Sequence, residues 1–250
     1  MDLVVAGAGP AYSARPGAVG AAYVLLEAGH AIVLDLGHGA YAGLAQIVEP
    51  STLDAVIVSH LHPDHFVDLV PLRHYLRHEF EPPRRVRVIA PRGLDRRLDD
   101  LHAEPGFSAE ALDVEVLTEG RLTIGPFGVE AWRITHTDDS YAFRVSASAR
   151  PDAPALVYSG DCGRADDLVP LIRPGDALLV EASFGTGPVP VDDMHLDAVA
   201  AARVATAAGV DRLLLTHVLG TYDFDAVVAT ARVTYAGDVR VVVPGDRIRI

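Results

Sequence analysis

The sequence predicts an α/β protein in which two β-sheets pack together with helices outside them, as one domain over residues 1–250. Short apolar runs rich in β-branched residues alternate with longer helical patterns along the whole chain. The strands come in two groups, each closed by helices, and no linker-like or low-complexity stretch divides the chain. Such layers bury the apolar face of every element, so a layered sandwich is the architecture we expect.

The individual elements follow from local pattern and from turn residues. The predicted strands are Leu3–Ala6, Ala21–Glu27, Ile32–Asp35, Ala55–Ser59, Val86–Ala90, Val114–Leu117, Leu122–Ile124, Val129–Thr135, Tyr141–Val145, Leu156–Ser159, Ala177–Val180, Arg212–Thr216 and Val239–Val242. The predicted helices are Tyr41–Val48, His65–His78, Leu94–Leu101, Arg164–Ile172, His195–Ala208 and Phe224–Tyr235. Of these, His195–Ala208 has the clearest ends, because Asp192 or Asp193 can cap its start and Gly209 can end it.

The charge balance limits the partners of the protein. The 21 basic residues, all arginine, face 34 acidic ones, which gives a formal net charge of −13. A strongly acidic chain is unsuited to long nucleic acid, which needs a basic face. One local exception to the acidic balance is a group of six arginines. Two interpretations of this group are open: a solvated surface, or a patch that attracts phosphate-bearing substrates. The group consists of Arg84, Arg85, Arg87, Arg92, Arg96 and Arg97.

Cysteine content and hydropathy indicate the cellular compartment of the protein. Cys162 is the only cysteine, so no internal disulfide can form. No stretch reaches the roughly 18 uninterrupted apolar residues that a membrane span needs, and the first residues lack a basic leader. We therefore expect a soluble cytoplasmic protein that does not interact with membranes.

The segment Ser59–His65 carries the strongest chemical signal in the chain. It reads Ser-His-Leu-His-Pro-Asp-His and directly follows the apolar run Ala55–Val58. Neutral imidazole and carboxylate bind zinc and similar divalent ions, and a loop at a strand end can spread these groups around an ion. Polar groups crowded against a buried strand otherwise lack partners. The segment therefore predicts a metal site.

With this motif the chain resembles the metallo-β-lactamase superfamily, whose HxHxDH signature stands intact here. Further family ligands appear in the expected order, each after a predicted strand. The resemblance covers essentially the whole chain and implies a four-layer αββα sandwich. It assigns His60, His62 and His136 to a first metal ion, Asp64, His65 and His217 to a second, and Asp161 to a bridging position.

The implied cofactors are two divalent metal ions. Ions about 3.5–4 Å apart share a water molecule and lower its pKa. An imidazole-rich site favours zinc, and the bridging carboxylate also admits manganese or iron. What the ions do not supply is a proton for the leaving group, so the site needs a general acid.

His195 is the candidate general acid. It lies before the last ligand strand, where the ribonuclease Z-like phosphodiesterase branch of the superfamily has a histidine that assists phosphodiester cleavage. In that branch the counterpart of Asp64 works with this histidine. The branch usually has His-Ser-Thr where this chain has His195-Leu196-Asp197. A helix-capping or surface histidine is the alternative.

Three neighbouring residues have open roles. Glu181 either orients a ligand or the acid, or is an exposed carboxylate at a strand end. His38, in a glycine-rich turn, either faces the metals or does not. Cys162 is expected to be a small packed residue, because family members commonly have threonine there. The glycines of Gly7-Ala8-Gly9 are expected to shape a turn near the metals, since Tyr12 stands where a dinucleotide-binding loop has its third glycine.

These features favour a phosphodiesterase that acts on a small substrate such as a cyclic nucleotide. The basic, glycine-rich arm with which ribonuclease Z grips transfer RNA has no visible counterpart here. A transfer-RNA 3′-processing endonuclease and a lactone, ester or thioester hydrolase remain alternatives, since the same metal site serves several chemistries. A non-catalytic metal- or nucleotide-binding sensor is a further alternative. Related enzymes often form homodimers, but no interface signal is visible.

Overall fold

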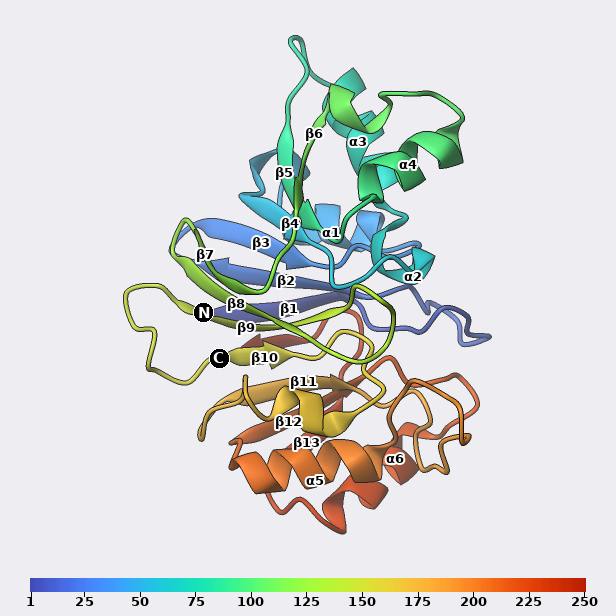
Figure 1. Ribbon diagram of the computed structural model, residues 1–250, viewed down its shortest axis with the longest axis vertical. Coiled ribbons are helices and arrows are strands. Elements are labelled where there is room, and N and C mark those ends of the chain that lie inside the picture. Colours follow the sequence, from blue (N-terminus) through green and yellow to red (C-terminus); the bar gives the residue numbers. More distant parts are fainter.

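The computed structural model describes residues 1–250 as two stacked seven-stranded sheets (Figure 1). The first sheet has the order β14-β1-β2-β3-β4-β5-β6, and the second has the order β13-β12-β11-β10-β9-β8-β7. The first sheet contains β1 (Asp2–Gly7), β2 (Ala22–Glu27), β3 (His30–Leu34), β4 (Ala55–Ile57), β5 (Val86–Ala90), β6 (Leu112–Val116) and β14 (Arg247–Arg249). The second contains β7 (Gly120–Ile124), β8 (Phe127–Arg133), β9 (Tyr141–Ala147), β10 (Leu156–Tyr158), β11 (Ala177–Glu181), β12 (Arg212–Thr216) and β13 (Asp238–Val241).

Helices cover the outer face of each sheet. Those on the first sheet are α1 (Tyr41–Ile47), α2 (Pro63–Phe66), α3 (Leu69–His78) and α4 (Leu94–His102). Those on the second are α5 (Ala198–Ala208) and α6 (Phe224–Arg232). The order of layers is therefore helix, sheet, sheet, helix, which confirms the predicted αββα sandwich. None of the helices combines the length and the apolar character that a membrane crossing requires.

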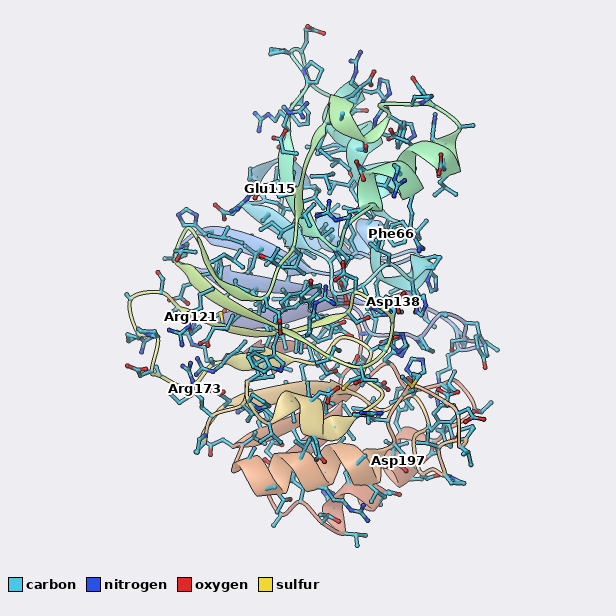
Figure 2. All side chains as sticks on the ribbon, viewed as in Figure 1. Phe66, Glu115, Arg121, Asp138, Arg173 and Asp197 are labelled. Carbon is cyan, nitrogen blue, oxygen red and sulfur yellow. The ribbon has the colours of Figure 1, made fainter.

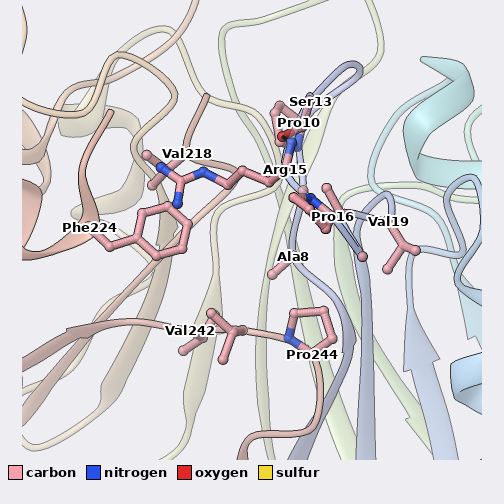
Figure 3. A pocket seen from close by; sticks show the side chains of 14 residues that line it. Ala8, Pro10, Ser13, Arg15, Pro16, Val19, Val218, Phe224, Val242 and Pro244 are labelled. Atoms are coloured by element: carbon pink, nitrogen blue, oxygen red, sulfur yellow. Dashed lines mark hydrogen bonds between the residues drawn. The ribbon is translucent and has the colours of Figure 1, made fainter. Parts of the chain in front are cut away.

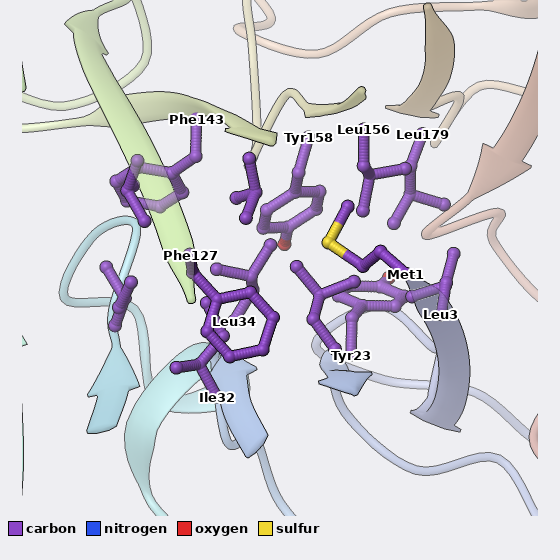
Figure 4. Packing of buried hydrophobic residues seen from close by; sticks show 14 of the residues in the cluster. Met1, Leu3, Tyr23, Ile32, Leu34, Phe127, Phe143, Leu156, Tyr158 and Leu179 are labelled. Carbon is purple, nitrogen blue, oxygen red and sulfur yellow. The ribbon is translucent and has the colours of Figure 1, made fainter. Parts of the chain in front are cut away.

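The apolar strands serve two cores at once because successive side chains point to opposite faces of a sheet. In β1, Leu3 and Val5 pack between the sheets while Val4 packs under the helices of the first sheet. In β11, Leu179 packs between the sheets and Leu178 under the helices of the second. Figure 4 shows the layer between the sheets. This double burial explains why many strands read as continuous apolar runs.

The strands that precede the predicted ligands all run in the same direction. In the first sheet, β3, β4, β5 and β6 are parallel. In the second, β10, β11, β12 and β13 are parallel, and β8 runs with them because two antiparallel pairings separate it from β10. The two sheets also meet at this edge, where Tyr141 N donates to Ser59 O (3.0 Å) and His217 N donates to Ala8 O (3.0 Å). The carboxyl ends of the strands therefore gather at one edge of the sandwich.

Two predicted helices are wrong in extent because proline has no N–H to donate. The predicted helix His65–His78 is divided into α2 and α3, because Asp68 N donates to Leu36 O (3.1 Å) outside the helix and Pro71 has no N–H to donate to the carbonyl of Val67. In the predicted helix Arg164–Ile172, only Ala165–Leu168 forms a 3₁₀ turn. Pro170 lies inside this range and prevents a regular α-helix.

The start of α5 and the last strand also differ from the predictions. The helix begins at Ala198, not at His195, because Asp197 rather than Asp192 or Asp193 is its cap and accepts a hydrogen bond from Ala200 N (2.8 Å). Figure 2 labels Asp197 at this end of the helix. His195 therefore lies in the preceding loop. Gly209 ends the helix as predicted, with φ 66°. Strand β14 was not predicted, since it is short and buries only Ile248.

A buried ion pair holds the turn between β9 and β10. The guanidinium of Arg144, 1% exposed, donates from Nε and Nη2 to the two carboxylate oxygens of Asp176 (2.8 and 2.9 Å). The same guanidinium donates to the carbonyls of Pro151 and Ala153 (3.2 and 3.0 Å). The buried guanidinium of Arg144 therefore anchors residues 147–154.

We predict that Asp176→Ala lowers the free energy of unfolding by about 3–5 kcal/mol, since it removes the buried, doubly hydrogen-bonded counter-charge of Arg144 and leaves only the longer contact with Glu130 (3.5 Å). Chemical denaturation measures the change. The matched control is Asp238→Ala, which breaks the exposed pair with Arg212 and is expected to change stability by less than about 1 kcal/mol. Equal effects of the two substitutions would contradict the role of the buried pair.

Candidate metal centre

Four of the predicted ligands form one cluster at the shared edge. Ligand atoms of His60, His62, His136 and Asp161 lie within 4.8 Å of one another. His62 Nδ1 is 3.1 Å from His136 Nε2, and Asp161 Oδ2 is 3.7 Å from His60 Nε2 and 3.8 Å from His136 Nε2. These residues follow β4, β8 and β10, so both sheets contribute to the cluster.

A second cluster shares Asp161 with the first. Ligand atoms of Asp64, His65, Asp161 and His217 also lie within 4.8 Å of one another. Asp161 Oδ2 lies 3.3 Å from His65 Nε2, and Asp161 Oδ1 lies 3.4 Å from His217 Nε2. Asp64 Oδ2 is 3.2 Å from His217 Nε2 and 3.5 Å from His65 Nε2. The two clusters are the two ligand sets expected from the sequence, and Asp161 lies between them.

The chemistry of the donor atoms fits divalent metal ions. His60 Nε2, His65 Nε2 and Asp161 Oδ1 are buried and have no hydrogen-bond partner. Buried polar atoms are rarely left without a partner, and these three lie where the two ligand sets converge. Burial also lowers the pKa of His60 well below its usual value, and the neutral imidazole it favours is the form that binds metals.

Hydrogen bonds behind the imidazoles fix which nitrogen faces the clusters. His65 Nδ1 donates to Asp35 Oδ2 (2.7 Å), His136 Nδ1 to Met194 O (2.8 Å) and His217 Nδ1 to Ser183 Oγ (2.9 Å). His60 Nδ1 faces Ser59 Oγ at 3.1 Å. A ring that donates from Nδ1 keeps the lone pair of Nε2 for a metal. Four of the five histidines are held in this way.

Asp35 is a functional residue that the sequence analysis missed. Its buried carboxylate accepts hydrogen bonds from the side chains of His65, Ser59 and Tyr158 (2.7, 2.8 and 2.7 Å) and from Ser59 N (2.6 Å). It directly follows β3, and its φ of 60° lies in the left-handed region, as does that of His217. A signal was present, since Asp35 is a carboxylate at the end of the apolar run Ile32–Leu34.

Glu181 is buried, so the alternative of an exposed carboxylate is wrong. Oε1 accepts from His195 Nδ1 (3.0 Å), Leu196 N and Cys162 N (3.1 Å each). Oε2 accepts from Ser183 N and Ser183 Oγ (2.9 and 2.8 Å). Glu181 therefore orients His195 directly, and it orients His217 through the hydroxyl of Ser183.

His195 lies at the rim of the second cluster. Its ring stacks on His217 with a centroid distance of 5.7 Å, and Nδ1 is 4.0 Å from Asp161 Oδ2. Burial disfavours its charged form, but the hydrogen bond and charge of Glu181 outweigh burial and raise the pKa of His195 to about 9. Asp64 was the expected partner of His195. Its Oδ2 instead lies within hydrogen-bond distance of His217 Nε2 (3.2 Å) and is 3.5 Å from His65 Nε2.

The remaining residues singled out in the sequence belong to neither ligand set. Cys162 is buried, and burial raises the pKa of its thiol to about 12, which fits the predicted packed role. His38 belongs to neither cluster. In the arginine group, Arg85 and Arg87 are paired with Asp113 and Glu115.

The loop after β1 adjoins the site, as its glycines predicted. Gly9 N donates to Val19 O (2.8 Å), and a Cβ on Gly7 would lie 1.9 Å from Gly20 O. Behind this loop lies an apolar hollow of about 370 Å³ (Figure 3). Arg15 crosses it with its guanidinium 4.0 Å above the ring of Phe224 and donates to the carbonyl of Tyr222. Arg15 thus ties the loop to the segment after His217.

Fold and site together define a class of protein. Stacked sheets that gather histidines and aspartates at one edge provide a binding site for divalent metal ions, as in metallo-hydrolases. Residues 30–218 match the family model of the beta-lactamase superfamily domain. The chain belongs to this superfamily.

Several relatives and solved structures are similar to the chain over most of its length. It is 32% identical over 239 residues to an uncharacterized protein of Mycobacterium tuberculosis, covering 90% of this chain and 84% of that protein. It is 28% identical over 259 residues to ribonuclease Z of Pyrobaculum calidifontis, covering 89% and 88%. The crystal structure of the metallo-β-lactamase fold protein YhfI from Bacillus subtilis matches with a TM-score of 0.86 at 22% identity, covering 99% and 98%.

We predict that Asp35→Asn weakens metal binding about 10–100-fold, the usual effect of losing the carboxylate behind a ligating histidine. Zinc retained after dialysis against a graded chelator buffer measures the affinity. The control is Asp113→Asn, which changes an exposed carboxylate on β6. If Asp35→Asn retains zinc as tightly as the unaltered protein, Asp35 does not orient His65 for binding.

Proposed function

We propose that the protein is a binuclear metal-dependent phosphodiesterase that acts on small phosphodiesters such as cyclic nucleotides. The first ion would be held by His60, His62 and His136, the second by Asp64, His65 and His217, and both by Asp161. Zinc is the ion we propose, because five of the seven proposed ligands are imidazoles. Bound there, the ions would activate water and neutralise charge that develops on phosphate oxygens.

The observation that carries the proposal is the pairing of His195 with the buried carboxylate of Glu181. An alkoxide is a poor leaving group, so phosphodiester cleavage benefits from a positioned proton donor. His195 Nδ1 is engaged by Glu181 at 3.0 Å, whereas Nε2 makes no hydrogen bond to the protein. In the proposed reaction His195 donates the Nε2 proton to the departing ribose oxygen, and Glu181 stabilises the positive charge on the ring before that transfer.

The charge of the chain and one relative support the substrate class. A net charge of −13 disfavours a long polyanion, so a small phosphodiester is the better fit. The similarity to a ribonuclease Z supports phosphodiester chemistry, because ribonucleases cleave phosphodiester bonds. Transfer-RNA processing and acyl ester hydrolysis are the competing outcomes of the experiments below.

The first experiment is hydrolysis of 3′,5′-cyclic AMP by the zinc- or manganese-loaded protein, followed by chromatography. We expect adenosine monophosphate as product. Asp161→Ala is expected to abolish its formation, because both ligand sets lose their shared carboxylate. No product from protein that demonstrably contains two equivalents of metal would contradict the cyclic AMP proposal. Lactones, thioesters and a transfer-RNA precursor then identify which alternative holds.

The second experiment tests His195 as the proton donor. We expect His195→Ala to lower kcat about 10²–10⁴-fold on a substrate with an alkoxide leaving group. The loss should be much smaller on bis(p-nitrophenyl) phosphate, whose leaving group needs little protonation. His30→Ala, which removes an exposed histidine paired with Asp54, is the control. An equal loss on both substrates would show that His195 does not act as the acid.

A further inference from the structure

A hollow of about 170 Å³ opens beside His195 and His217, and the proposed reaction does not account for it. Its walls come from the loop after β1, the turn after β11, the stretch before α5 and the segment after His217. The residues that form it include Pro10, Tyr12, Phe184, Asp193 and Leu219. Because His195 is the proposed donor to the leaving group, this hollow adjoins the place where that group departs.

Aromatic side chains flank the hollow. The ring of Phe184 is 6.4 Å from that of His195, tilted by 57°. Tyr12 is 72% exposed although it is a large aromatic residue, and it lines the hollow from the loop after β1. Arg15 ties that loop to the segment that carries Leu219. Aromatic faces provide stacking surfaces for planar nucleobases.

The carboxylate of Asp193 decides what else the hollow can bind. It is half-buried and makes no hydrogen bond or ion pair, whereas Asp64, Asp161 and Glu181 are engaged in the metal centre or behind it. An ionised carboxylate only accepts hydrogen bonds and repels phosphate. Asp193 therefore suits the donor edge of a ligand and not its phosphate.

Among the nucleobases, guanine offers the best match to a free carboxylate. Its N1–H and its 2-amino group point the same way and can donate to both carboxylate oxygens, which is a strong bidentate arrangement. Adenine presents a bare ring nitrogen next to its amino group, so it can make only one of these bonds and brings a lone pair towards the negative charge.

We propose that this hollow binds the base of the nucleoside leaving group between Tyr12 and Phe184, and that Asp193 makes the site prefer guanine to adenine. This inference rests on the proposed phosphodiesterase function. It identifies the substrate class as a guanine nucleotide phosphodiester, such as 3′,5′-cyclic GMP.

Calorimetric titration of the zinc-loaded protein with guanosine and adenosine 5′-monophosphates tests the inference without turnover. We expect guanosine monophosphate to bind about tenfold or more tightly, the usual effect of hydrogen bonds to a charged group. Asp193→Asn should remove this preference. Asp192→Asn, which changes the neighbouring exposed carboxylate outside the hollow, should retain it. Phe184→Leu should weaken both nucleotides by a similar factor.

The outcomes separate this inference from the proposed function. Equal affinity for the two nucleotides, or a guanine preference that survives Asp193→Asn, would overturn the inference. Hydrolysis of bis(p-nitrophenyl) phosphate by the same preparation would then leave the phosphodiesterase proposal standing. A guanine preference lost in Asp193→Asn would support the base site. If no phosphodiester is hydrolysed as well, the proposed function fails while the base site stands.

Discussion

The carboxylate of Asp161 is the group on which the rest of the site depends. It is buried between two sheets, and burial of an unpaired charge would be strongly unfavourable. Histidines from both sheets surround it, with His65 Nε2 at 3.3 Å and His217 Nε2 at 3.4 Å. These contacts outweigh the effect of burial and hold the pKa of Asp161 well below its usual range. The same carboxylate belongs to both ligand sets, so it contacts residues that follow strands of both sheets.

The alternation of apolar strands and helices predicted stacked sheets with helices outside, and the resemblance to the superfamily implied the four-layer order and the seven candidate ligands. Parallel strands deliver their carboxyl ends to one edge, so polar residues that directly follow apolar strands meet in space even when they lie far apart in the chain. His136 and Asp161 were expected from the resemblance to the superfamily, and the dense motif at Ser59–His65 predicted a metal site from its residues alone.

The cap of α5 and the roles of Asp35 and Glu181 could not be predicted from the sequence. They depend on competition between neighbouring residues or on contacts between distant parts of the chain. Three aspartates lie near the start of α5, and only the structure shows that Asp197 is its cap. The accepting role of Asp35 requires His65 and Tyr158, which come from distant positions in the chain. The burial of Glu181 likewise follows from tertiary packing, because the residues that donate to it belong to the loop after β10 and to the loop between β11 and α5.

The backbone at Asp35 and His217 has a consequence for the evolution of the protein. Both residues have φ of 60°, a conformation that disfavours side chains other than glycine and typically costs about 1–3 kcal/mol. Glycine would relieve this strain at either position but would remove a side chain that the metal centre uses. Selection for thermal stability alone would therefore push these positions away from function. Each position therefore exchanges folding stability for the contacts that its side chain makes in the candidate metal centre.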